Sequence, residues 1–202
     1  MTNLEKYRSL LTDVDALLLT GRVNRMYAAQ YGIAEGVCVI TRDEAFYFTD
    51  GRYIEAAQNN LEGFTALIVD REHPYTDRIN EVIAKYTVKT LGFEEAELSY
   101  AEYQRYSAKL HAVLVPYQEK LDAPRAAKEP WELERMRAAQ KVTDKVFAEL
   151  LDVIRAGMTE KELEAELIYR LYKYGAEEPS FDPIVVSGLN TSLPHGVAGQ
   201  RE

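Results

Sequence analysis

The chain has 202 residues, of which 47% are hydrophobic, and this suits one large domain or two small ones with a sizeable core. Its formal net charge of −9 argues against a nucleic-acid-binding protein, because such proteins usually carry a basic face. No apolar run approaches the roughly 20 residues of a membrane span, and no signal-peptide pattern opens the chain, so we expect no membrane partner. The single cysteine, Cys38, excludes an internal disulfide and a CxxC metal site, which favours a reducing, cytoplasmic location.

Residues 1 to about 120 alternate between short apolar runs and helical patterns. Apolar residues at helical spacing predict a first helix over 3–15, with Thr2 or Asn3 as its N-cap. Further helices are predicted over 52–60, after Thr76, and after Ser99, where Glu102 completes a capping box. Residues 24–31 form a loop or a short helix. The predicted strands are the apolar runs 16–20, 36–41, 45–49, 64–69, 89–93 and 112–116.

This order predicts an α/β domain with a mixed sheet and flanking helices. The run 16–20 is continuously apolar, which is typical of a strand buried on both faces. The short link between the runs 36–41 and 45–49 predicts a hairpin. Neither GxGxxG nor GxxxxGK[ST] occurs, so a nucleotide site is not expected. Asp50 and Arg52 are interpreted as a turn residue and its salt-bridge partner.

Residues 121–130 contain two prolines and mixed charge, which predicts a connector and divides the chain into domains 1–124 and 125–202. After it, Pro130 begins a long helix that Gly157 is predicted to end. A capping box at Thr159 begins another helix, which Gly175 ends. The glutamates of that helix recur every two residues, which predicts a solvated face; they are Glu160, Glu162, Glu164 and Glu166.

The apolar run Ile184–Val186 is bounded by Pro183 and Gly188 and is predicted to be a buried strand. A polar loop follows, in which His195 stands between a proline and a glycine. Two helices, one strand and a loop are an incomplete α+β domain, because an isolated strand leaves its backbone groups unpaired. Taken alone, a single histidine in such a loop is more often a solvated surface residue than a site residue, because one histidine carries little signal.

The stretch Pro179–Gly188, followed by Asn190 and Leu193–Gly196, resembles the start of the catalytic domain of the proline peptidases. These are the Xaa-Pro aminopeptidases and prolidases, within the "pita-bread" family that also includes creatinase and methionine aminopeptidase. The helix entry at Lys128–Arg135, the turn at Gly157–Glu160 and the pentapeptide Thr49–Tyr53 are similar to the same family. The resemblance implies a creatinase/prolidase-type N-terminal domain over 1–124 and a partial pita-bread catalytic domain over 125–202.

The resemblance further implies metal-dependent hydrolysis of the peptide bond before proline. Two divalent cations, commonly manganese or cobalt, activate a bridging water in that family. The histidine that matches His195 lies beside the metals and contacts substrate, and the phenylalanine that matches Phe181 lines the substrate pocket. The family's five metal ligands lie downstream of the His-Gly motif, so none is present up to Glu202. We therefore expect no metal on this chain alone and no activity from it alone.

The implied partners are proline-containing peptides and a second copy of the chain, since the family's N-terminal domain often mediates homodimers. Two alternatives stay open. One is a non-catalytic binding or dimerisation protein on the same scaffold, and the other is a creatinase-like C–N hydrolase.

Overall fold

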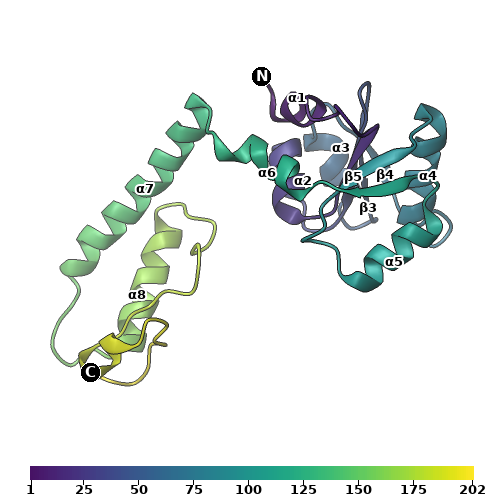
Figure 1. The fold of residues 1–202 in the computed structure, drawn as a ribbon. Coiled ribbons are helices and arrows are strands. Elements are labelled where there is room, and N and C mark those ends of the chain that lie inside the picture. Colours follow the sequence, from purple (N-terminus) through teal and green to yellow (C-terminus); the bar gives the residue numbers. More distant parts are fainter. The chain divides into compact units, whose positions relative to one another are not determined.

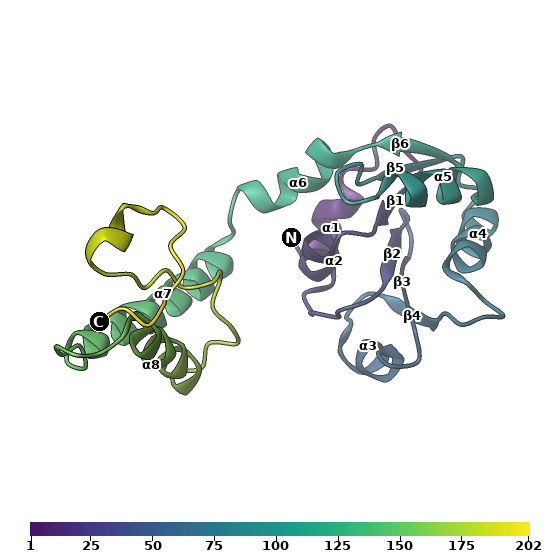
Figure 2. The same cartoon turned by 90° about the horizontal axis from the view of Figure 1, so that it is seen from below.

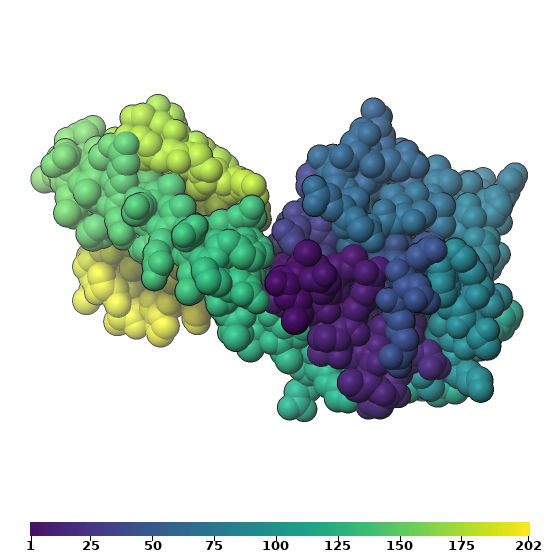
Figure 3. Space-filling view, turned by 90° about the horizontal axis from the view of Figure 1, so that it is seen from above, coloured from purple at the N-terminus to yellow at the C-terminus, as the bar shows by residue number.

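The computed structural model describes residues 1–202, which divide into two compact units. The N-terminal unit spans Met1–Ala127 and the C-terminal unit spans Lys128–Glu202. Figure 1 shows the elements of each unit in chain order, and Figure 3 shows each unit as a densely packed body. No helix in either unit has both the length and the apolar character needed to cross a membrane.

The N-terminal unit is built on one mixed six-stranded sheet with strand order β4-β3-β2-β1-β5-β6. Only β2 runs antiparallel to its neighbours, while β1, β5 and β6 are mutually parallel and β3 is parallel to β4. This confirms the predicted mixed sheet, including the hairpin between β2 and β3. The strands are β1 Ala16–Leu19, β2 Val37–Ile40, β3 Ala45–Thr49, β4 Thr65–Ile68, β5 Thr90–Phe93 and β6 Val113–Pro116.

Helices cover both faces of this sheet (Figure 2). Alternate residues of a strand point to opposite faces, so Leu17 and Leu19 enter one core cluster while Ala16 and Leu18 enter the other. Residues of α1, α2, α3 and α6 contribute to the first cluster, and residues of α4 and α5 to the second. These helices are α1 Asn3–Arg8, α2 Arg22–Ala29, α3 Ile54–Asn60, α4 Tyr75–Tyr86, α5 Tyr100–Lys109 and α6 Gln118–Ala126.

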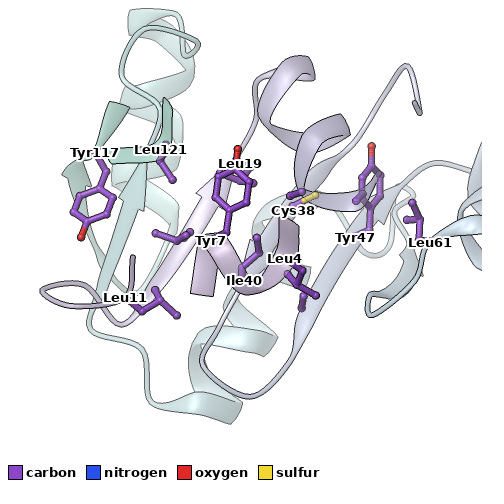
Figure 4. Packing of buried hydrophobic residues seen from close by; sticks show 14 of the residues in the cluster. Leu4, Tyr7, Leu11, Leu19, Cys38, Ile40, Tyr47, Leu61, Tyr117 and Leu121 are labelled. Carbon is purple, nitrogen blue, oxygen red and sulfur yellow. The ribbon is translucent and has the colours of Figure 1, made fainter. Parts of the chain in front are cut away.

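The helix α6 lies where the sequence predicts a connector. Its Leu121 is fully buried in the first core cluster, on the same face of the sheet as Tyr7 and Tyr117 (Figure 4). Pro124 lies inside the helix and lowers the local helical propensity. Burial of Leu121 offsets that cost, so the segment belongs to the N-terminal unit.

Helix caps were partly predictable. The capping boxes at Thr2, Ser99 and Thr159 are all formed, because each is followed by a glutamate three residues later. Helix α4 instead begins one residue before the predicted Thr76, with Pro74 as its N-cap.

The C-terminal unit consists of two packed helices, α7 Pro130–Leu151 and α8 Glu160–Lys173, and a long irregular segment with one 3₁₀ helix, η1 Gly188–Ser192. Helix α7 ends at Leu151, well before the predicted Gly157. The predicted strand Ile184–Val186 is wrong, because these residues pair with no other strand. The reason is that the unit contains no sheet in which a strand could hydrogen-bond.

Candidate functional site

The loop after η1 carries His195, whose side chain is exposed. The neighbouring Gly196 is buried, and its amide donates to the Leu193 carbonyl at 3.2 Å to close a tight turn. A β-carbon at position 196 would lie 2.8 Å from Val186, so only glycine allows this close approach. The turn therefore rests against the segment that was predicted to be a strand.

The carboxylate of Glu160 gathers this loop around the first turn of α8. Oε1 accepts from the Ser187 amide at 2.6 Å, from the Ser187 hydroxyl at 3.1 Å and from Asn190 Nδ2 at 3.1 Å. Oε2 accepts from the Gly199 amide at 3.0 Å. Both carboxylate oxygens are therefore occupied by donors from the segment 187–199.

The loop also satisfies backbone groups at the start of α8. The first amides of a helix have no partner within the helix. Here the Glu160 amide donates to the Arg201 carbonyl at 2.8 Å, and the Lys161 amide donates to the Gly199 carbonyl at 3.0 Å. Figure 1 shows the resulting position of the chain's last residues beside the beginning of α8.

Glu160 is thus buried, with 4% of its surface exposed, and its assignment to a solvated face is wrong. Hydrogen bonds from the Ser187 amide first, and then from Gly199 and Asn190, hold the pKa of Glu160 below its ordinary value. Sequence spacing missed this residue because its partners lie about 30 residues further along the chain. Of the other three glutamates, Glu162 lies on the exposed side of the helix, as predicted.

Phe181 lies in a different part of the C-terminal unit. It borders an apolar groove of about 620 Å³ formed by α7, α8 and the segment 175–184, and 73% of its own surface is exposed. His195 does not line this groove, so the two predicted site residues do not meet there. The apolar side chains along the helices include Val142, Val146, Phe147, Leu167 and Leu171.

The N-terminal unit contains a buried carboxylate that the sequence reading also missed. Glu94 is 1% exposed and follows β5, and its Oε2 accepts from the Thr20 and Gly21 amides at 2.6 and 2.7 Å. Asn24 Nδ2 donates to the other oxygen at 2.7 Å. Burial raises the pKa of Glu94 despite these hydrogen bonds.

The remaining candidates of this unit have structural roles. Arg52 pairs with Asp50 at 2.6 Å across the turn that precedes α3, as predicted. Cys38 is fully buried, and burial raises the pKa of its thiol, which leaves it unreactive. His73 lies 3.3 Å from Asp70 in an exposed loop.

No three side chains of His, Cys, Asp or Glu come together in a way that could hold a metal ion. The residues of this chain therefore do not fit a metal centre, and no chemical step is assigned to one here.

The two units match two family models in succession. Residues 6–127 match the creatinase/prolidase N-terminal domain, and residues 134–202 match metallopeptidase family M24. The chain therefore belongs to the creatinase/prolidase family, with an N-terminal domain of that type followed by part of an M24 domain.

Individual relatives agree with this assignment. The chain is similar to the "Uncharacterized peptidase YqhT" of Bacillus subtilis, with 34% identity over 201 residues, covering 98% of this chain and 56% of that protein. The structure resembles the Xaa-Pro dipeptidase from Bacillus anthracis with a TM-score of 0.90 and 31% identity, covering 98% of this chain and 56% of the other. It resembles the X-Pro aminopeptidase from Thermotoga maritima with a TM-score of 0.88 and 28% identity, at the same coverage. The chain spans a little over half the length of these relatives.

Proposed function

We propose that this chain forms the N-terminal part of a metal-dependent peptidase that hydrolyses the bond before proline in Xaa-Pro substrates. The observation that supports it most directly is the turn Pro194–His195–Gly196, fixed against Val186 and presenting an exposed imidazole. This turn lies in the part of the chain that matches family M24, and relatives over the whole chain are named as Xaa-Pro dipeptidases and aminopeptidases.

In this proposal His195 contacts the substrate. An exposed imidazole on a closed turn can donate a hydrogen bond to a carbonyl oxygen that gains negative charge during hydrolysis. Phe181 contributes an exposed aromatic ring to the same catalytic domain, where it would border the substrate pocket.

The metal ions belong to a segment other than the one described. In the family, two divalent cations such as manganese or cobalt are held by two aspartates, one histidine and two glutamates. Those ligands would come from the part of the M24 domain that the relatives possess beyond their match to this chain. When bound, the cations would supply the activated water.

The experiment is a chimera that joins residues 1–202 to the part of the Bacillus anthracis Xaa-Pro dipeptidase that this chain does not cover. We expect hydrolysis of Xaa-Pro substrates in the presence of manganese or cobalt. In that chimera, His195→Gln should lower kcat/KM by about 10²–10³, the usual effect of losing one donor to a developing oxyanion. His111→Gln is the matched control, because His111 lies in the N-terminal unit and is exposed.

The substrate panel separates the alternatives. Xaa-Pro dipeptides and longer Xaa-Pro peptides distinguish dipeptidase from aminopeptidase, and creatine tests the C–N hydrolase. Equal rates for the two histidine variants would contradict the role of His195. A folded chimera that binds metal but cleaves none of these compounds would favour the non-catalytic scaffold.

A further inference from the structure

One carboxylate holds both sides of the turn that carries His195. Glu160 Oε1 accepts from the Ser187 amide at 2.6 Å, which precedes His195 in the chain. Glu160 Oε2 accepts from the Gly199 amide at 3.0 Å, which follows it. The side chain of Glu160 therefore holds the His195 turn from both sides.

That side chain is itself fixed. Glu160 is the first residue of α8, whose start is closed by the capping box of Thr159 and Glu162. Helix α8 also packs on α7, where the Tyr174 hydroxyl donates to Glu149. The carboxylate of Glu160 thus anchors the irregular segment around His195 to helix α8, which is itself packed on α7.

We infer that Glu160 is a positioning residue for His195, which it holds by closing the loop 187–199 on the first turn of α8. This inference rests on the proposed function for its catalytic meaning, because His195 is the residue that would contact substrate. The loop closure itself is a property of this chain and can be measured without activity.

The geometry requires a carboxylate at position 160. Its two oxygens face four donors, namely two backbone amides, the Ser187 hydroxyl and the Asn190 side chain. A glutamine would replace one oxygen by an NH₂ group, which would then face either the Ser187 or the Gly199 amide, donor against donor. In either orientation one side of the loop loses its acceptor.

A second contact closes the same loop. Gly188 adopts a φ of +52°, and a β-carbon built there would lie 2.8 Å from the guanidinium carbon of Arg201, so the two residues are in close contact. Arg201 in turn supplies its carbonyl to the Glu160 amide at 2.8 Å. The two ends of the segment 187–201 therefore meet each other as well as the carboxylate.

The test is residue-level hydrogen exchange by NMR on the intact 202-residue chain. In Glu160→Gln we expect protection of the Ser187 and Gly199 amides to fall at least about ten-fold, since charge-assisted hydrogen bonds are lost from a local closure. Amides in the middle of α7 should change by less than about two-fold. The matched control is Glu164→Gln, which removes the same charge from the same helix but pairs only with Lys161.

The imidazole gives a second readout that a general loss of stability would not produce. The chain has three histidines, and His73 and His111 lie in the N-terminal unit as internal references. In Glu160→Gln we expect the His195 ring resonances to move toward those of a short peptide of the same sequence, while His73 and His111 stay unchanged. Glu164→Gln should leave all three unchanged.

Unchanged protection at Ser187 and Gly199, with unchanged His195 resonances, would overturn the inference. If Glu160→Gln does not fold, Asn190→Ala decides the question, because it removes one donor to the carboxylate and leaves Glu160 in place. It should lower protection of the same two amides by a smaller factor, and no change would count against the closure.

The catalytic part is tested in the active chimera by a double-mutant cycle. Glu160→Gln should lower kcat more than it raises KM, and it should have little further effect once His195→Gln is present, since both changes act on one group. Additive effects would overturn the positioning role. An inactive chimera would contradict the proposed function. The hydrogen-exchange results would still decide whether Glu160 closes the loop.

Discussion

The burial of Leu121 makes a strong prediction about residues that the sequence presents as a connector. Leu121 is fully buried in the first core cluster, and its removal would leave a cavity between α6 and the sheet. Leu→Ala changes at such sites destabilise by about 2–5 kcal/mol. With a loss of about 3 kcal/mol and an m-value of about 2 kcal/mol/M, the urea midpoint of Leu121→Ala should fall by about 1.5 M.

The assay can separate the two units. The single tryptophan, Trp131, lies in α7 and reports on the C-terminal unit, whereas all but three of the 14 tyrosines lie in the N-terminal unit. Tyrosine near-UV circular dichroism should show the shift, and tryptophan fluorescence should not. Met26→Ala is the control, because Met26 is 44% exposed on α2 and should cost less than about 0.5 kcal/mol. A Leu121→Ala midpoint within about 0.3 M of the wild type would refute the packing of α6.

Two further predictions follow from a raised pKa and from a positive φ. Because the pKa of Glu94 is raised in the folded state, its contribution to stability is fully present below its unfolded pKa of 4.5 and is lost as pH rises through the folded value. The unfolding free energy of the wild type relative to Glu94→Gln should therefore fall above pH 4.5, by at most about 1.4 kcal/mol per pH unit, in urea titrations at several pH values. A difference that is constant with pH would contradict this. Gly188→Ala should destabilise the C-terminal unit by the roughly 1–2 kcal/mol of left-handed strain, because the nearest atoms to its new methyl group belong to the guanidinium of Arg201, the end of a flexible and exposed side chain that can move away. Gly157→Ala has a φ of +85° with open space around it, so its melting shift by Trp131 fluorescence should be similar, and a clearly larger shift for Gly188→Ala would show that Arg201 cannot move away.

The sheet was predictable because its signals are local. The run Ala16–Leu19 is apolar at every position and is buried at every position, since both faces of β1 are covered by helices. Capping boxes are equally local, because a serine or threonine and a glutamate three residues later determine a helix start. In a capping box, the interacting residues lie within a few positions of each other in the sequence, so the pattern can be recognised locally.

The wrong predictions concern residues whose partners lie far away in the sequence. Glu160 was assigned to a solvated face because its hydrogen-bond donors come from residues 187–199. The sequence next to Glu160 contains no signal for these distant partners. The segment Ile184–Val186 has the composition of a strand, but a strand exists only where another strand can pair with it. Leu121 is one apolar residue among charges and prolines, so its burial depends entirely on the shape of the core beneath it.

Phe181 and His195 were selected by resemblance and not by pattern. The structure places both in the C-terminal unit, one at an apolar groove and the other on an exposed turn. Their meeting at one substrate remains a prediction for the chimera experiment. The spacing of Ser187 and Asn190 was the one available signal for the loop, since residues three apart in a helical turn present donors to one acceptor.

The buried Glu94 takes a position in the N-terminal unit that a ligand often occupies in sheets of this type. It fills the space beyond the carboxyl ends of β1 and β5, the parallel neighbours at which the chain changes direction across the sheet. Open α/β sheets usually receive a ligand at this position, where free amides at a helix start attract an anion. Here the carboxyl group of Glu94 accepts from the amides of Thr20 and Gly21, which immediately precede α2, and from the side chain of Asn24 in its first turn, so a side chain of the protein occupies the place of such a ligand.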